Sequence, residues 1–512
     1  MDILYLPIDE RPCNTTIVEM IADTGSDIHL KMPPVKLLGS KKKAALTEKL
    51  WEWVGKEAAN CDGLIFSPEL MLYGGLIPSR LHHLNEGKRQ EMLDRLTKIK
   101  QKNPDIKIVS STIVMRTPKY NSSDEEPDYY EDYGQSIFLS KYLEDKKKRM
   151  GLSEEEERQL KKAADETPQE VIADYETRRA YNLETSFSML GLISKGIIDF
   201  IVVPQDDSAE FGYTAIDQKK VFEFINKQKL RQQTLVYPGS DEVGASLLAR
   251  LVNEQKGRQP KIFAFYSSTL GPSLIPNYED RPFNETLKKH ILAVNGRLVD
   301  SMNDADIILA YNTPGKVMQE SWEQQKEVDS TYYSFRDIQT FVERIKEGLR
   351  TGKKVIVADC AYSNGGDKEL LDYLFQEKVF LNLHSYKGWN TNANTLGTTL
   401  SQGCVADRLS KKTVKTNIYH LLDDYIYQAV VRMKMTETVL EDEGLNYFDL
   451  QDKAKGINHL VSEDILRVVK EDFPELTEEI EISHLASRSP WNRMFETELT
   501  FNLTIMAGEF ID

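Results

Sequence analysis

The chain has 512 residues, 40% of them hydrophobic and 29% charged, which is the balance of an ordinary globular protein. Its 65 Lys and Arg face 81 Asp and Glu, and the formal net charge of -16 argues against a protein that grips the phosphates of nucleic acid. The N-terminal MDILYLPIDERP lacks the basic start and long apolar core of a signal peptide, and no stretch approaches the roughly 18 apolar residues that span a bilayer. We therefore expect a cytoplasmic protein that acts on a small molecule and binds neither nucleic acid nor a membrane, with its oligomeric state left open.

Short runs rich in Ile, Val, Leu, Phe and Tyr recur along the chain, and most lack the polar alternation of a strand with one wet face. Such runs are typical of strands that are buried on both sides of a parallel sheet. In chain order the predicted strands are Ile3–Pro7, Gly63–Ser67, Ile106–Ile113, Phe200–Pro204, Thr234–Tyr237, Ile262–Tyr266, Ile307–Tyr311 and Val355–Ala358. Two weaker candidates, His29–Met32 and Val379–Leu383, are left out of this count.

Helices are predicted between these strands, at Lys41–Ala59, Lys88–Gln101, Lys219–Gln228, Asp241–Gln255, Thr286–Val294 and Phe335–Arg350. The repeated strand–helix order indicates an α/β protein. Eight strands match a TIM-barrel-like (β/α)8 core, which would occupy residues 1–404 as a catalytic domain. Two doubly wound α/β domains divided near Gly257–Pro260 are the alternative, and the local pattern does not decide because both folds repeat the same unit.

Two segments look like additions to this core. Residues 122–179 are highly charged and are predicted to form a helical insertion whose charge runs are solvated faces. The strand–helix rhythm stops after the core, and residues 405–512 are predicted to form a mainly helical C-terminal extension. This extension closes with ETELTFNLTIM, whose alternation predicts a final strand.

Polar residues gather where the predicted strands end, which is where parallel α/β folds bind ligands. Ordinary loop polarity explains part of this pattern, but it explains less well why acids and arginines converge on one end of the strands. The substrate-binding residues predicted in these loops are Asp9, Arg11, Glu69, Tyr73, Arg80, Arg116, Tyr237, Asp241, Asn364 and Asp367.

The strand Phe200–Pro204 is followed by two adjacent carboxylates, Asp206 and Asp207. Two nearby carboxylates repel each other, so one of them can keep a raised pKa and stay protonated while the other is ionised. Acid/base catalysis needs this division, and we predict both residues as catalytic. The alternative is that Asp207 caps the next helix and Asp206 bonds a loop amide.

Two glycine-containing loops look suited to a ligand. In YKGWNTNANTLGT, the ring of Trp389 is suited to stack on a pyranose while Asn390 and Asn394 bond its hydroxyls. The alternative is a structural tryptophan with turn-forming asparagines. In PELMLYGGLIPSR, the adjacent Gly74 and Gly75 would allow close backbone approach to a ligand.

No cofactor and no metal site are predicted. None of the 8 His lies in an HxH or HExxH pattern, and the four Cys form no CxxC pair, so ligands for a transition metal are few. The carboxylates of Asp206, Asp207 and Asp241 are the ones available to hold Mg²⁺ or Ca²⁺, which is the minority alternative.

The combination of LPIDERP, SPELMLYGGLIPSR, VPQDDSAEFG, YPGSDEVG, YSNGGD and YKGWNTNANTLGT resembles an uncharacterised bacterial family, DUF4127. These motifs run over most of the chain. The resemblance implies that their loops belong to one site, but it brings no activity with it.

A second resemblance concerns the chemistry. The Asp–Asp pair is similar to that of the β-N-acetylhexosaminidases that use substrate assistance, in which the acetamide of the substrate attacks the anomeric carbon. By that resemblance Asp206 would steady the acetamide and Asp207 would protonate the leaving oxygen, while Tyr237, Trp389 and Asn390 would wall the pocket. It remains an analogy at the level of the fold.

The sequence therefore predicts a glycoside hydrolase that acts on small saccharides, N-acetylhexosaminides among them, through paired carboxylates. A carboxylate-metal-dependent hydrolase or lyase of an anionic small molecule is one alternative, suggested by Arg11, Arg80, Arg116 and Arg178. A non-catalytic sugar-binding protein is the other.

Overall fold

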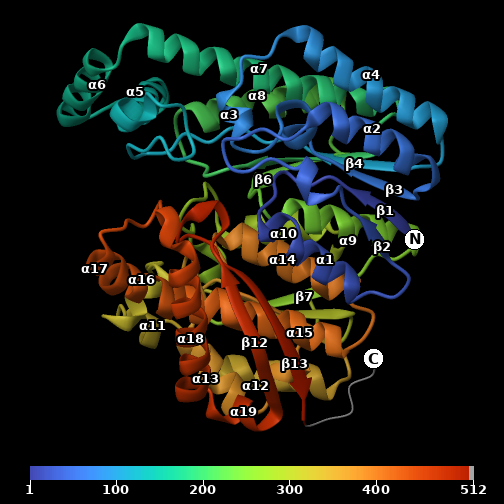
Figure 1. The fold of residues 1–512 in the computed structure, drawn as a ribbon, viewed down its shortest axis with the longest axis vertical. Helices are drawn as coiled ribbons and strands as arrows, with labels where there is room; N and C mark the ends of the chain where they lie inside the picture. The colour runs from blue at the N-terminus through green and yellow to red at the C-terminus, as the bar shows by residue number, and fades with distance from the viewer. Residues whose placement is uncertain (507–512) are drawn as a thin grey trace. The chain divides into compact units, whose positions relative to one another are not determined.

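The computed structural model describes residues 1–506 (Figure 1). The chain forms two compact units. The first comprises Met1–Glu10, Ile28–Leu247 and Tyr278–Asp280, and the second comprises Arg11–Asp27, Leu248–Asn277 and the residues from Arg281 onward. Each unit contains one parallel sheet of its own.

The sheet of the first unit has six parallel strands in the order β2-β1-β3-β4-β5-β6. Their bounds are β1 Asp2–Tyr5, β2 His29–Lys31, β3 Gly63–Phe66, β4 Lys107–Ser111, β5 Phe200–Gln205 and β6 Thr234–Pro238. Every residue of β3, β5 and β6 is buried, which explains their unbroken apolar runs.

Some helices of the first unit lie in the predicted charged insertion. The helix bounds in this unit are α2 Thr47–Glu57, α3 Pro78–Leu81, α4 Glu86–Lys102, α5 Tyr130–Met150, α6 Glu154–Glu166, α7 Gln169–Ser194 and α8 Tyr213–Gln228. Apolar side chains of α2, α4, α7 and α8 pack with those of the strands in one core, to which Leu50, Leu96, Leu190, Val221 and Ile201 contribute. Helices α5, α6 and the first part of α7 occupy residues 122–179, between β4 and β5.

The sheet of the second unit has five parallel strands in the order β11-β10-β9-β7-β8. Its strands are β7 Lys261–Tyr266, β8 Arg297–Leu298, β9 Ile307–Asn312, β10 Lys354–Asp359 and β11 Ser385–Lys387. The helices of the second unit up to residue 405 are α1 Thr16–Asp23, α10 Phe283–Ala293, α11 Thr331–Ser334, α12 Ile338–Arg350, α13 Lys368–Gln376 and α14 Asn392–Val405. Helix α9, Val243–Gln255, begins in the first unit and ends in the second.

Helices cover both faces of this second sheet. A Cβ on Gly348 of α12 would meet Val355, while one on Gly403 of α14 would meet Ile356. Val355 and Ile356 are neighbours in β10 and point to opposite faces, so α12 and α14 lie on opposite sides.

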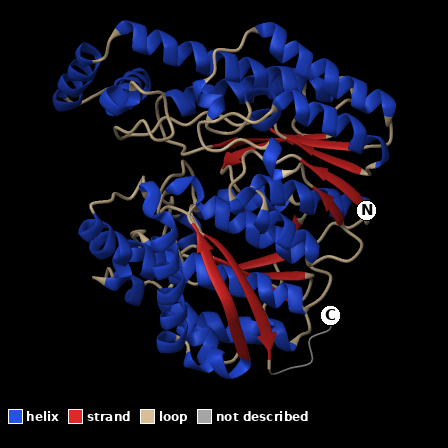
Figure 2. Ribbon diagram, viewed as in Figure 1, coloured by secondary structure: helices blue, strands red, loops and turns tan. Residues whose placement is uncertain are grey.

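The residues after α14 add helices and a ribbon to the second unit. The helices are α15 Lys411–His420, α16 Arg432–Met435, α17 Glu441–Glu443, α18 Ala454–Asp472 and α19 Pro474–Glu479, with π-helical turns at Leu421–Val431 and Thr436–Leu440. The antiparallel strands β12 Ile480–Arg488 and β13 Glu498–Ile505 form the ribbon (Figure 2). Strand β13 is the final strand predicted from ETELTFNLTIM.

The predicted TIM-barrel-like core over residues 1–404 is wrong, because no sheet among residues 1–506 closes on itself. All eight predicted strands form, but they are divided between two open sheets on either side of Gly257–Pro260, as in the alternative with two α/β domains. The count of eight leaves out His29–Met32, which forms β2, and it lacks the very short β8 and β11. Val379–Leu383 is not a strand, since Phe380–Asn382 is a 3-10 turn.

Both sheets begin with the same change of direction. In each, the second strand lies on one side of the first and the third strand lies on the other side. This reversal opens a crevice at the carboxyl ends of the two diverging strands, where ligands of such folds bind. In the first unit those strands are β1 and β3, so the loops that follow them and their neighbours are the expected place for a site.

Substituting Gly403 by Leu is expected to destabilise the second unit. A Cβ at this position would lie 2.8 Å from Cγ2 of the buried Ile356, so the side chain overpacks the helix–sheet contact at a cost of about 1–3 kcal/mol. Gly456 of α18 is the matched control, because a Cβ there meets nothing within 4 Å. Thermal unfolding should show a lower Tm for Gly403→Leu and an unchanged or higher Tm for Gly456→Leu, and equal effects of the two would contradict the packing described.

Candidate active site

The chain bends sharply after β5 and presents two carboxyl groups at the end of the strand. Gln205 ends the strand, and Asp207 has a φ of 43, a left-handed conformation that few residues other than glycine adopt. The side chain of Asp206 is 12% exposed, whereas that of Asp207 is 32% exposed. The turn thus separates an inner carboxylate from an outer one, and backbone strain of this kind clusters at functional sites.

The inner carboxylate is held by the buried guanidinium group of Arg80. Arg80 Nη2 donates to Asp206 Oδ2 over 2.7 Å, and Arg80 is 2% exposed. Arg80 lies in α3, and Arg178 Nη1 of α7 donates to its backbone carbonyl over 3.0 Å. Breaking a buried pair of this kind leaves an uncompensated charge, so the pairing fixes the position of both groups.

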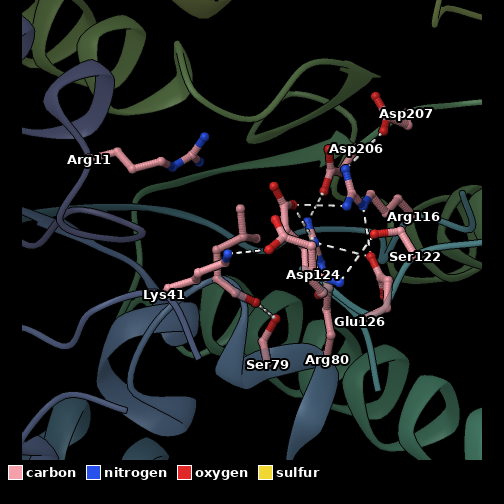
Figure 3. A network of polar contacts seen from close by, with 12 residues as sticks. Arg11, Lys41, Ser79, Arg80, Arg116, Ser122, Asp124, Glu126, Asp206 and Asp207 are labelled. Atoms are coloured by element: carbon pink, nitrogen blue, oxygen red, sulfur yellow. Dashed lines mark hydrogen bonds and ion pairs between the residues drawn. The ribbon is translucent and has the colours of Figure 1, made fainter. Parts of the chain in front are cut away.

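The outer carboxylate is held by Arg116, which shares two further carboxylates with Arg80 (Figure 3). Arg116 Nη1 donates to Asp207 Oδ2 over 3.2 Å. Glu126 Oε1 accepts from Arg80 Nη1 at 3.1 Å and from Arg116 Nε at 2.9 Å. Glu125 Oε2 accepts from Arg80 Nη1 at 3.1 Å and from Arg116 Nη2 at 2.9 Å. We call these two arginines and four carboxylates the carboxylate–arginine network.

The carboxylate–arginine network contains more acids than bases. Burial, followed by the negative charge of Asp206, raises the pKa of Asp207 to about 6, while Arg116 and Arg80 act in the opposite direction. A carboxyl group with this pKa both holds and releases a proton near neutral pH, which suits general acid/base catalysis. The surplus of acids favours a reaction in which positive charge develops on the substrate.

Sequence reasoning missed Glu125 and Glu126. They belong to the charged insertion, whose runs were expected to be solvated, and that prediction is wrong here because Glu126 is 1% exposed. The usable signal was their place in the loop that follows a strand-end arginine, Arg116. The same loop also contributes Asp124, which forms an ion pair with Lys41 (Figure 3).

A small cavity lies beside the inner carboxylate. Glu69, Tyr73, Arg80 and Asp206 are among its lining residues, and its volume of about 10 Å³ is enough for roughly one water molecule. The hydroxyl group of Tyr73 donates to Thr185 of α7 over 3.1 Å. This cavity adjoins Asp206 and is too small to hold a saccharide.

Glu69 is a buried acid held within its own unit. Its Oε1 accepts from the backbone N–H of Ile113 at 2.9 Å, and its Oε2 accepts from the hydroxyl group of Ser67 at 2.8 Å. Burial raises the pKa of Glu69 above its ordinary value. It begins the π-helical turn Glu69–Tyr73, a rare geometry that is frequent at functional sites.

The glycine pair after this turn approaches the chain itself. Gly74 has a φ of 93, and a Cβ there would lie 2.7 Å from the Cβ of Ala44. The backbone N–H of Ala45 donates to the carbonyl of Gly74 over 2.8 Å. The close approach predicted at Gly74 is therefore made to the segment before α2.

Three other predicted residues of the first unit, Asp9, Tyr237 and Asp241, are buried at strand ends. Beside them is Glu242, which was not among the predicted site residues. The backbone N–H of Ser240 donates to Glu242 Oε2 over 3.0 Å, and burial raises the pKa of Glu242 to about 8. Glu242 is therefore mostly protonated at neutral pH, a second carboxylic acid at the ends of β5 and β6.

In the second unit, Asp367 belongs to a separate buried network. Asn312 Nδ2 donates to Asp359 Oδ1 at 2.8 Å and to Asp367 Oδ2 at 2.9 Å, and Arg336 Nη2 donates to Asp367 Oδ2 at 2.7 Å. Burial and the charge of Asp367 raise the pKa of Asp359 to about 7. The network joins the carboxyl ends of β9 and β10 and contains none of the predicted catalytic residues.

The predicted sugar-binding loop is tightly packed within the second unit. Trp389 is 8% exposed, and the centre of its ring lies 6.3 Å from that of Phe495. The carbonyl of Asn390 accepts from the backbone N–H of Asn364 at 2.9 Å, and Asn394 is 4% exposed. Within this unit a ring buried to that extent does not offer a face to a pyranose. The alternative, a tryptophan with a structural role, therefore fits its surroundings better.

Arg11 also belongs to the second unit. Its Nη1 donates to Glu496 Oε1 over 3.4 Å, and its guanidinium carbon lies 4.7 Å from the centre of the Trp491 ring. The structure therefore brings together Asp206, Asp207, Arg80 and Arg116 in the first unit, while Arg11, Asn364, Asp367, Trp389, Asn390 and Asn394 lie in the second.

Comparison with known families identifies the family of the chain. A family model described as "Protein of unknown function (DUF4127)" matches residues 3–500. The chain belongs to the DUF4127 family. The match includes residues of both units and of both parallel sheets. A search of the curated proteins found no match, and the resemblance to the hexosaminidases stays a prediction.

Within residues 1–506, no three or more His, Cys, Asp or Glu side chains are grouped so that they could hold a metal ion. No helix in that range has the length and apolar character needed to cross a bilayer.

Substituting Asp207 by Asn is expected to raise stability at high pH. The pKa of Asp207 in the folded protein, about 6, exceeds its ordinary 3.8, so the folded state binds this proton more tightly than the unfolded state does. Its contribution to stability therefore falls as pH rises from about 4 to about 6 and stays unfavourable above that range. Thermal unfolding should show a higher Tm for the variant at about pH 8 and nearly equal Tm values at about pH 3.5.

The matched control is Glu210→Gln, an exposed acid in the same loop, which should leave the Tm unchanged at both pH values. A Tm difference for Asp207→Asn that does not change with pH would contradict the raised pKa.

Proposed function

We propose that this DUF4127 protein hydrolyses the glycosidic bonds of small saccharides, with Asp207 as the general acid and base. The observation that carries the proposal is the division within the Asp206–Asp207 pair. The inner carboxylate is locked to a buried arginine, and the outer one is partly exposed with a pKa of about 6. These are the two environments that acid/base chemistry requires.

In the proposed reaction Asp207 donates its proton to the glycosidic oxygen as the bond from that oxygen to the anomeric carbon breaks. The leaving group departs as an alcohol, and positive charge develops on the sugar ring. Asp206, which Arg80 keeps in place, stabilises that charge. Asp207 then takes a proton from the water that attacks the anomeric carbon, so that one water is consumed per bond.

In an N-acetylhexosaminide the oxygen of the substrate's own acetamide forms the first new bond to the anomeric carbon. Water then displaces that oxygen, and Asp207 accepts the proton of the water. This route needs no enzyme nucleophile, and it suits a pair in which Asp206 is already held by Arg80.

The charge of the carboxylate–arginine network supports a neutral saccharide over an anionic substrate. Both arginines are already bound by carboxylates, with Arg116 contacting Glu125 and Glu126 at 2.9 Å each. An anion would have to displace one of these buried partners, which costs about 3–5 kcal/mol when a buried pair is broken. An oxocarbenium-like transition state is cationic and meets no such penalty.

The test compares substrates whose leaving groups differ in their need for a proton. In a panel of disaccharides and dinitrophenyl glycosides, N-acetylhexosaminides included, Asp207→Asn should lower kcat/KM for disaccharides about 10²–10⁴-fold, because the general acid is lost. Dinitrophenolate leaves without needing a proton, so kcat/KM for the dinitrophenyl glycosides should fall much less. Asp206→Asn should impair both classes, because it removes the stabilising charge.

For wild type, kcat/KM on a disaccharide should decline above about pH 6, where Asp207 loses its proton. Glu210→Gln serves as the control and should retain activity. The proposal fails if wild type cleaves no glycoside of the panel, or if Asp207→Asn affects both leaving groups equally.

A further inference from the structure

Helices α2 and α4 of the first unit lie side by side over its sheet (Figure 1). Residues of both helices line a groove. The groove has a volume of about 270 Å³, close to the lower end of the range for small-molecule sites. We call it the α2/α4 groove. It is lined by Glu48, Trp51, Glu52, Gly55, Ala58, Ala59, Arg95, Lys98, Ile99 and Lys102.

Contacts between the two helices close the groove at both ends. At one end Arg95 Nη2 donates to Glu48 Oε2 over 2.6 Å. At the other, Asn103 Nδ2 donates to the carbonyls of Ala58 and Cys61, each over 3.0 Å. Ala58 lies ten residues after Glu48, which corresponds to about 15 Å along the helix, so these contacts bound the groove in length.

The floor of the α2/α4 groove is apolar and rigid. The ring of Trp51 is fixed because its indole N–H donates to the carbonyl of Met71 over 3.1 Å. Gly55 is exposed in the middle of α2, and a Cβ there would meet nothing within 4 Å. Glycine destabilises a helix interior by about 1 kcal/mol relative to alanine, and here it leaves the space above the floor open.

The rim of the α2/α4 groove is basic. Its lining contains three basic side chains, Arg95, Lys98 and Lys102, and two acidic ones, Glu48 and Glu52. Arg95 pairs with Glu48 and with Glu91 outside the groove, whereas Lys98, Lys102 and Glu52 form no ion pair among the described residues. Two ammonium groups therefore face one carboxylate, and the stems of the lysines extend the apolar wall. A ligand with an apolar chain and one negative charge complements both the floor and the rim.

We propose that the α2/α4 groove is a binding site for a free medium-chain aliphatic carboxylate. The chain lies along Trp51, Gly55 and Ile99, and the carboxylate meets Lys98 and Lys102. A membrane lipid carries similar chemistry, but neither helix bears one of the large exposed apolar side chains that would enter a bilayer. The proposal is independent of the glycosidase proposal, since no residue of the groove belongs to the carboxylate–arginine network.

The test is isothermal titration calorimetry with sodium decanoate below its micelle concentration. Wild type should bind one decanoate per chain. Gly55→Leu fills the groove and should weaken binding at least tenfold, while its helix propensity keeps the protein folded. Lys98→Glu with Lys102→Glu should weaken binding several-fold, and decylammonium should not bind wild type.

Two matched controls separate the groove from general effects. Gly191→Leu places the same side chain at a helical glycine of α7 where a Cβ also meets nothing within 4 Å, and Lys56→Glu reverses an exposed charge of α2 outside the groove. Both should bind decanoate like wild type. The proposal is overturned if wild type does not bind decanoate, if Gly55→Leu binds it unchanged, or if wild type binds phosphatidylglycerol vesicles and Gly55→Leu does not, which would make the groove a membrane-lipid site.

Discussion

The first unit depends on the pairing of two arginines with four carboxylates at the ends of its central strands. The guanidinium of Arg80 is 2% exposed, and taking such a charge out of water costs several kcal/mol unless close carboxylates compensate for it. Asp206 at 2.7 Å and Glu126 at 3.1 Å provide that compensation. The loop after β3, the loop after β4 and the turn after β5 must therefore assemble together.

This requirement gives the charged insertion a structural role. Its first residues, Glu125 and Glu126, lie between Arg80 and Arg116 and accept from both. Without them Arg80 would keep only Asp206 and Arg116 would keep only Asp207. Arg116 would then be free to take up a substrate anion. The insertion thus sets the charge of the site, which in turn sets the sign of the transition state that the site can stabilise.

Much of the fold followed from the sequence, because strands buried on both faces leave unbroken apolar runs. All eight such runs are strands, whereas β8 has two residues and β11 has three, too few to show a period. The prediction of a barrel was wrong for a different reason. Closure depends on which strands pair, and strand order is a long-range property that neither the runs nor their number encodes.

The candidate site was partly predictable for similar reasons. Asp206, Asp207, Arg80 and Arg116 were found because parallel strands direct their ends to one edge. Burial was the part that the sequence did not reveal. Glu126 looks like a solvated acid and is 1% exposed, and Trp389 looks like a sugar platform and is 8% exposed. Whether a polar or aromatic side chain is covered depends on segments distant in the chain, so its local sequence does not report it.

Carbon-13 NMR of the aspartate carboxyl carbons tests whether Asp207 is the proton-carrying member of its pair. A pH titration of the labelled protein should contain a resonance with a midpoint near pH 6 that is missing from Asp207→Asn. Asn at this position identifies the signal without changing the shape of the side chain. If the resonance assigned to Asp207 titrates at about pH 4 or below, as an ordinary aspartate does, the division of roles between Asp206 and Asp207 is contradicted.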